Sequence, residues 1–245
     1  MSDHYRRALD VQNRGFGGYN TGFARELFDS IFAKKEQAAN VPQVRLVTIW
    51  FGTNDACLPH NPMGQHTPLP LFRQNLEFFL ESLTSSSSPY AAAHSPLSIV
   101  LITPAPMCES LLPPVLAEAR EAEVTKQYVD VVNELAKEWR AKGEKEGGKW
   151  RVEGVDMWKA VLDDAAGDEE KMKGYFTDGL HLSTAGYAIF WKEYTRLVKG
   201  PLKNRGLDWD DLVDCPPRSA LWDDLDHKRP ESVGENMKQS PFRST

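Results

Sequence analysis

The sequence predicts an α/β fold in which a parallel sheet lies between layers of helices. Three apolar runs, at residues 44–51, 98–103 and 150–156, have the length and composition of buried strands. Segments with helical periodicity separate these runs, and strands that alternate with helices favour βαβ units. With 245 residues, of which 41% are hydrophobic, the chain is long enough to form one sizeable core.

The N-terminal part is expected to contain a short strand followed by a helix. Residues 11–14 are expected to form the strand, which leads into a glycine-rich turn. Thr21 is a suitable N-cap for the helix. The apolar face of that helix comprises Phe23, Leu27, Ile31 and Phe32. The run 44–51 is nearly continuous in apolar and β-branched residues, which is typical of a central parallel strand.

Strands and helices also alternate along the rest of the chain. A helix is expected to open at Thr67 or at the prolines beside it, and Pro104 ends the strand at 98–103. The segment 84–96 is small, polar and rich in serine, which is typical of a surface connection. Further helices are expected at residues 118–145, 161–172 and 185–198.

Residues 1–200 are expected to form one domain. After Pro201 the pattern fades, and residues 201–226, which include Trp209 and Trp222, are expected to pack on the surface of that domain. Residues 227–245 are expected to form a disordered tail, because they contain too few apolar residues to be buried.

Charge and cysteine content argue against several classes of protein. A net charge of −6 with scattered basic residues argues against binding to nucleic acid or to an anionic membrane surface. No apolar run approaches the roughly 20 residues that span a bilayer. The three cysteines are odd in number and widely spaced, which indicates reduced thiols in an intracellular, cytoplasmic protein. No metal is expected, since neither Cys57 with His60 nor His60 with His66 supplies enough ligands.

The segment 177–183 is the most informative stretch for function. It places a carboxylate three residues before a histidine, in a glycine-containing turn ahead of a helix. In such a turn Asp178 is able to accept a hydrogen bond from one imidazole nitrogen of His181, which leaves the other nitrogen to take a proton. These are two of the three groups of a hydrolase triad. The alternative is a turn in which Asp178 caps the next segment and His181 is a surface residue.

Two further motifs follow expected strands, at the sheet edge where α/β proteins bind their ligands. Residues 13–21 form a glycine-rich turn, and residues 52–55 read Gly-Thr-Asn-Asp. Taken alone, the first is also typical of any strand-to-helix turn and the second of an Asx turn. Asp55 is expected to fix the loop of Asn54 through backbone N–H groups, whereas Arg14 is equally well interpreted as a surface charge.

The order of these motifs resembles the SGNH (GDSL-type) hydrolases, and most closely the isoamyl-acetate-hydrolysing esterases. The resemblance covers roughly residues 5–198. It implies a flavodoxin-like three-layer α/β/α fold and hydrolysis of small, acetate-like carboxylic esters, in lipid metabolism, without a cofactor. It makes Asp178 and His181 the catalytic pair. It also makes the side-chain amide of Asn54 and the backbone N–H of Gly18 the two donors of the oxyanion hole.

The family's first motif, a strand that ends in Gly-Asp-Ser and carries the nucleophile, is absent from the sequence. Ser2 is no substitute, because it falls in the region of the first helix and not at a strand-to-helix elbow. We therefore expect an N-terminally truncated domain that lacks its first strand and is impaired in ester hydrolysis. The alternatives are a catalytically silent relative that binds a small molecule or a partner, and a truncated gene model.

The missing strand has a structural consequence. In the expected sheet it would lie between residues 11–14 and residues 44–51, so these two segments should be about 10 Å apart and unable to pair directly. Residues 11–14 would then have no neighbour, and one edge of the strand at 44–51 would be exposed, unless the core rearranges to close the gap. Phe16 and Tyr19, near the first motif, are candidates for the wall of an acyl or alcohol pocket, although apolar residues near strand ends more often belong to the core.

Overall fold

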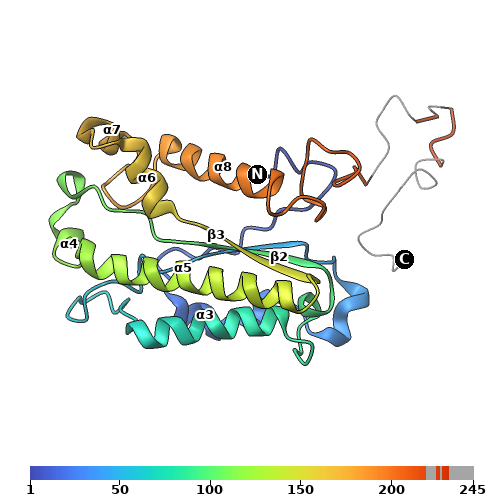
Figure 1. Cartoon of the computed structure of the whole chain (residues 1–245), viewed down its shortest axis with the longest axis horizontal. Helices are drawn as coiled ribbons and strands as arrows, with labels where there is room; N and C mark the ends of the chain where they lie inside the picture. Colours follow the sequence, from blue (N-terminus) through green and yellow to red (C-terminus); the bar gives the residue numbers. More distant parts are fainter. Residues whose placement is uncertain (219–224, 227, 232–245) are drawn as a thin grey trace.

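The computed structural model describes residues 1–218, 225, 226 and 228–231. Within these residues three parallel strands pair in the order β1-β2-β3, with β1 at Leu46–Trp50, β2 at Leu97–Ile102 and β3 at Trp150–Val155. In the register of the sheet Trp50 lies beside Ile102, which lies beside Val155. The three strands therefore end at the same edge, on the left side of Figure 1 where α4 and α7 lie.

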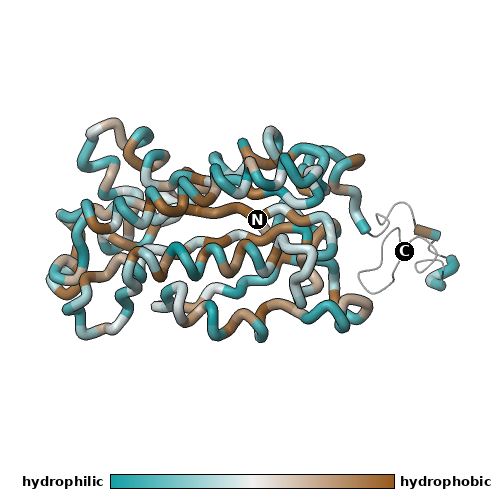
Figure 2. Tube along the Cα trace, turned by 60° about the horizontal axis from the view of Figure 1, so that its bottom comes forward, coloured by the Kyte–Doolittle hydropathy of each residue, from teal (hydrophilic) through white to brown (hydrophobic). Residues whose placement is uncertain are grey.

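Helices cover both faces of the sheet, so the expected three-layer α/β/α fold is confirmed. Helices α3 (Leu69–Thr84) and α5 (Ala122–Lys145) lie on one face, and α6 (Met157–Ala165) and α8 (Thr184–Lys199) lie on the other (Figure 1). In Figure 2 the strands form a hydrophobic band between helices that alternate between hydrophobic and hydrophilic residues.

Strand β2 is buried along its whole length and supplies both halves of the core. Because side chains alternate along a strand, Ile99 and Leu101 join the cluster under α3 and α5. Val100 and Ile102 face the other way and join the cluster under α6 and α8. The sheet is thus packed on both faces, as a parallel sheet requires.

The shorter elements connect these layers. They are α1 (Thr21–Glu26), α2 (Phe28–Ile31), α4 (Pro114–Ala117), α7 (Glu169–Gly174), and the 3-10 helices η1 (Lys35–Asn40), η2 (Ala91–His94) and η3 (Glu109–Leu111). The single helix expected at 161–172 is divided into α6 and α7, because Ala166 and Gly167 both have positive φ angles, of 53° and 83°. The connection at 84–96 is not wholly on the surface, since it contains η2 with Ala92 and Ala93 buried.

The prediction of a strand at residues 11–14 is wrong. These residues have no regular secondary structure, and Val11 is 43% exposed. A strand forms only where a neighbour takes its backbone hydrogen bonds, and no described strand lies beside this segment. Strand β1 is correspondingly an edge of the described sheet and not a central strand, and three of its five residues are half-buried. The expectation that the two segments do not pair directly is confirmed.

The helix after the glycine-rich turn starts as expected but is capped and packed differently. Asn20 is the N-cap, and its side-chain oxygen accepts from the N–H of Phe23 at 2.9 Å. The helix ends at Glu26, and α2 continues from Phe28. Phe23 was expected on the apolar face but is 49% exposed.

The residues after α8 contribute to the core beneath that helix. Leu202 and Leu207 are buried, and the indole of Trp209 stacks on that of Trp191 with ring centroids 5.1 Å apart. Trp222 and most of the tail expected at 227–245 lie outside the described residues. No helix among the described residues is both long and apolar enough to cross a membrane.

Candidate active site

The loop between α7 and α8 brings Asp178 and His181 into direct contact. The Nδ1 of His181 lies 2.8 Å from Oδ2 of Asp178. The other carboxylate oxygen, Oδ1, accepts from the backbone N–H groups of Leu180 at 3.0 Å and His181 at 2.8 Å. The N–H of Thr177 donates to the carbonyl of His181 at 2.8 Å and closes the turn. The hydrogen bond expected between the two side chains is therefore present.

These hydrogen bonds stabilise the ionised form of Asp178. Partial burial raises the pKa of Asp178, but the hydrogen bonds from the backbone and imidazole of His181 and from Leu180 outweigh it and lower the pKa to about 2. The imidazole is 72% exposed, and no described residue hydrogen-bonds to its Nε2. With Nδ1 directed at a carboxylate, Nε2 is the nitrogen available to take a proton.

Gly179 fixes this loop against the segment that follows β2. Its carbonyl accepts from the N–H of Cys108 at 2.8 Å, and its φ angle is +84°. A Cβ at this position would lie 2.5 Å from the carbonyl oxygen of Cys108 and 2.8 Å from the nitrogen of Leu112. Only glycine allows such a close approach in this conformation. The loop of Asp178 and His181 is thus held to a segment that leaves the sheet at its C-terminal edge.

Asn54 leaves the sheet at the same edge, four residues after the end of β1. Its side chain is half-buried, and its Nδ2 donates to the carbonyl of Tyr19 at 2.9 Å. An amide nitrogen carries two N–H groups, so a second donor remains. The structure thus joins the Gly-Thr-Asn-Asp motif to the glycine-rich turn, two motifs that the sequence separates by more than thirty residues.

Gly18 lies in that glycine-rich turn with a φ angle of +79°. Its carbonyl accepts from Nε2 of Gln65 at 2.9 Å, and the backbone carbonyl of Gln65 accepts from Nδ2 of Asn20 at 2.9 Å. Among the described residues no acceptor takes the N–H of Gly18. The half-buried ring of Tyr19 stacks on the exposed ring of Phe16, with centroids 5.1 Å apart. Gln65 was not singled out from the sequence, and nothing in its proline-rich surroundings indicates its role.

Asp55 fixes the loop of Asn54, as expected, and it also holds Thr21, which follows the glycine-rich turn. It is fully buried, and its Oδ1 accepts from the backbone N–H of Thr21 at 2.9 Å and from the Thr21 hydroxyl at 2.5 Å. Its Oδ2 accepts from the N–H of Gly52 at 3.2 Å. Burial raises the pKa of this carboxyl, while these hydrogen bonds act in the opposite direction. Arg14 is a surface residue whose guanidinium donates to Gln12 at 3.0 Å.

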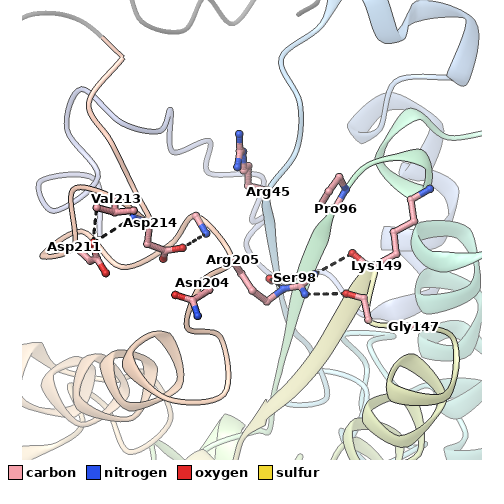
Figure 3. Close-up of a pocket in the computed structure, with 12 residues that line it drawn as sticks. Arg45, Pro96, Ser98, Gly147, Lys149, Asn204, Arg205, Asp211, Val213 and Asp214 are labelled. Atoms are coloured by element: carbon pink, nitrogen blue, oxygen red, sulfur yellow. Dashed lines mark hydrogen bonds between the residues drawn. The ribbon is translucent and has the colours of Figure 1, made fainter.

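The opposite edge of the sheet carries a surface depression of about 550 Å³ (Figure 3). The guanidinium of Arg205 reaches across it and donates to Oγ of Ser98 at 2.9 Å and to the carbonyls of Leu97, Gly148 and Lys149 at 2.9–3.0 Å. All four acceptors lie in or next to the starts of β2 and β3. None of the residues predicted for catalysis lines this depression. No group of three or more histidine, cysteine, aspartate or glutamate side chains among the described residues is arranged to hold a metal ion.

A family model and the similar proteins assign this chain to the same family. Residues 1–189 match the model of the GDSL-like lipase/acylhydrolase family. A GDSL esterase/lipase of Arabidopsis thaliana is 32% identical over 94% of this chain and 86% of its own length. The human isoamyl acetate-hydrolyzing esterase 1 homolog is 27% identical over 93% of this chain and 85% of its own length. The chain therefore belongs to the GDSL-like lipase/acylhydrolase family.

Proposed function

We propose that this chain carries the base and the oxyanion donors of a hydrolase of small, acetate-like carboxylic esters. His181 is the general base and Asp178 orients it and stabilises the imidazolium that forms. The observation that carries the proposal is the contact of 2.8 Å between Nδ1 of His181 and the ionised carboxylate of Asp178. Nε2 then takes the proton of an attacking hydroxyl and returns it to the leaving alcohol.

Asn54 and Gly18 are proposed as the oxyanion donors. The tetrahedral intermediate of ester hydrolysis carries negative charge on the former carbonyl oxygen, and donors fixed in advance stabilise that charge. The second N–H of the Asn54 amide and the N–H of Gly18 have no other described acceptor. The side chain of Asn54 is tied to the loop of Gly18 through the carbonyl of Tyr19, which supports their acting on one oxygen atom.

The nucleophile is the group that these residues do not supply. The 245 residues contain no Gly-Asp-Ser sequence, and no described serine hydrogen-bonds to His181. Removing the nucleophile of a serine hydrolase costs about 10⁶ in turnover. We propose that the chain alone is strongly impaired, and that full activity requires a serine presented to Nε2 of His181.

The substrate is proposed to be a small ester with an apolar alkyl group. The exposed ring of Phe16 stacks on the half-buried ring of Tyr19 beside Gly18, which supports an apolar binding surface, and the names of the relatives include isoamyl acetate as a substrate. Serine, imidazole and oxyanion donors suffice for this reaction, so it needs no cofactor. Cys57, Cys108 and Cys215 are buried as free thiols, which supports an intracellular, cytoplasmic site of action, and we place the substrate in lipid metabolism.

The absence of the serine motif also favours a second candidate function. The same residues would then bind a small ester, its acid or a partner without turnover. Hydrolysis separates the two candidates, because a binding protein gains nothing from a restored nucleophile.

The experiment compares three proteins with ethyl acetate as substrate. They are the chain itself, the chain extended at its N-terminus by a strand that ends in Gly-Asp-Ser, and the same extension ending in Gly-Asp-Ala. We expect the first and third to hydrolyse ethyl acetate at or near the rate of the buffer, and the second to exceed them by several orders of magnitude. Equal rates for the serine and alanine extensions would exclude the hydrolase. Turnover by the unextended chain that a serine-directed phosphonate abolishes would show that another serine is the nucleophile.

A further inference from the structure

Arg120 is a buried guanidinium without a partner. It lies just before α5, its residue is 6% exposed, and neither Nε nor Nη1 has a hydrogen-bond acceptor among the described residues. It forms no ion pair with any of the described carboxylates. Two of the three guanidinium nitrogens are thus held out of water without a partner, which is costly for an ionised group and indicates a ligand that the protein alone does not provide.

Arg205 shows what a structural arginine looks like in the same protein. Its guanidinium is only partly buried, yet it makes four hydrogen bonds to one side chain and three backbone carbonyls. Arg120 is more deeply buried and makes none from its side chain. Hydrogen bonds within the protein therefore account for the burial of Arg205 but not for that of Arg120.

The surroundings of Arg120 belong to the proposed ester site. The carbonyl of Ala119 accepts from the N–H of Leu58 at 2.9 Å, which holds the segment before α5 against the loop that follows β1. In that loop the N–H of Cys57 donates to the carbonyl of Asn54 at 3.0 Å. Arg120 acts electrostatically on the thiol of Cys57. The segment that carries Arg120 is therefore held against the loop that carries Asn54.

Neither of the nearby acidic groups neutralises Arg120. Burial raises the pKa of the Cys57 thiol, so this group remains protonated, and its Sγ lies 3.5 Å from Oε1 of Gln65. The carboxylate of Asp55 is already occupied by the N–H and hydroxyl of Thr21 and by the N–H of Gly52. The charge of Arg120 is thus left for an external anion.

We propose that Arg120 binds the carboxylate of a small organic acid next to the Asn54 loop. Binding of a carboxylate at Arg120 is independent of hydrolysis, whereas the reaction in which this acid takes part rests on the proposed function. A carboxylate suits the position, because a guanidinium pairs with carboxylates through parallel hydrogen bonds.

The carboxylate has two possible sources. Ester hydrolysis releases a carboxylate product, and a half-ester of a dicarboxylic acid carries a carboxylate of its own. Either places the anion beside the loop of Asn54, and the experiment below distinguishes them.

The first experiment measures the melting temperature of the chain as sodium acetate replaces sodium chloride at constant ionic strength. We expect the melting temperature to rise saturably, by about 5–10 °C when the acetate concentration is a hundredfold above its Kd. Arg120→Met should lose the response and should melt at or above the unliganded protein, since an unpaired buried charge has been replaced by an apolar chain. Arg45→Gln, which removes a cation from the depression of Figure 3, should keep the full response.

A second measurement does not depend on the folding of the variant. In protein labelled with ¹⁵N-arginine, the Nε–H signal of a buried guanidinium should move saturably with acetate and follow the same midpoint. A melting temperature that is the same in acetate and chloride, an acetate response that persists in Arg120→Met, or an Nε–H signal that does not move would each overturn the proposal.

Comparing the melting temperature in two esters identifies the source of the carboxylate. If the ester carries the anion, monoethyl succinate should raise the melting temperature and neutral diethyl succinate should not. If only acetate is effective, the bound group is the product. A rise with diethyl succinate equal to that with monoethyl succinate would contradict carboxylate recognition. His181→Ala should retain the acetate response, so a failure of hydrolysis and a failure of carboxylate binding are distinguishable.

Discussion

Asp55 and Thr21, 34 residues apart in sequence, are joined by two hydrogen bonds to the same carboxylate oxygen, from the backbone N–H of Thr21 at 2.9 Å and from its hydroxyl at 2.5 Å. This contact ties the loop after β1 to the first residue of α1. The first of these segments carries Asn54, and the second follows directly on the turn of Gly18. A buried carboxylate thus determines how the two proposed oxyanion donors lie relative to each other.

The first prediction is that Asp55→Ala strongly destabilises the protein. The change leaves the buried donors of Thr21 and Gly52 without an acceptor, which should lower the free energy of unfolding by about 2–5 kcal/mol. Urea denaturation measures this loss. Asp130→Ala, which removes an exposed carboxylate paired with Lys126, should cost less than about 1 kcal/mol. A loss for Asp55→Ala no larger than that of the control would show that this carboxylate is not a structural support.

The second prediction compares two glycines with nearly the same backbone conformation. Gly179 and Gly167 have φ angles of +84° and +83°, but a Cβ on Gly179 would meet backbone atoms at 2.5 and 2.8 Å while one on Gly167 would meet nothing within 4 Å. Gly167→Ala should therefore lower the free energy of unfolding by only about 1–2 kcal/mol, because alanine disfavours the left-handed backbone conformation. Gly179→Ala should cost about 1–3 kcal/mol more, since a backbone segment must move. Equal losses in urea denaturation would contradict the close approach of the two loops.

The third prediction concerns the titration of Asp178. Its carboxyl ¹³C signal should titrate with a midpoint at about 2 instead of the ordinary 3.8. Because the pKa is lowered in the folded state, the contribution of this carboxylate to stability is present above about pH 4 and is lost as the pH falls through about 2. His181→Ala should raise the midpoint, since it removes the imidazole but keeps the backbone donors. A midpoint near 3.8 in the unaltered chain would show that the two side chains do not interact in solution.

The fourth prediction tests the oxyanion donor. In the chain extended by Gly-Asp-Ser, Asn54→Ala should lower kcat for ethyl acetate by about 10²–10³ with a much smaller change in KM, because the donor acts mainly on the charge of the transition state. The melting temperature of the variant reports the loss of the hydrogen bond to Tyr19 separately. A change confined to KM would assign Asn54 to substrate binding and not to the oxyanion hole.

The sequence predicts best the parts of the fold that depend on local patterns. Strand β2 and helices α3, α5 and α8 were recognisable because their apolar residues recur with the period of the element and face a core. The turn of Asp178 and His181 was also predictable, since both partners lie within four residues. The unpaired edge of β1 was predictable only from the family resemblance, because the absent Gly-Asp-Ser strand would lie beside β1, whereas the apolar run alone indicates burial and not the number of neighbouring strands.

What the sequence could not predict depends on contacts between distant residues. Gln65 holds the carbonyl of Gly18 from 47 residues away, and a lone glutamine in a loop gives no sign of such a contact. Arg120 is buried in a segment that is held to the distant loop of Leu58, a contact that no local pattern contains. Residues 11–14 failed as a strand for the same reason, since strand formation needs a partner that a local pattern does not contain.

The central claim is that His181 is the base of an ester hydrolase. The most direct test is kcat for ethyl acetate in the chain extended by Gly-Asp-Ser, compared with its His181→Ala variant. The account predicts a loss of about 10⁶, as large as the loss from removing the serine, because neither group acts without the other. His94→Ala, which alters a histidine that binds the carbonyl of Ser88, should leave the rate unchanged. If the His181→Ala variant keeps most of the activity of the extended chain, the assignment of the site is wrong.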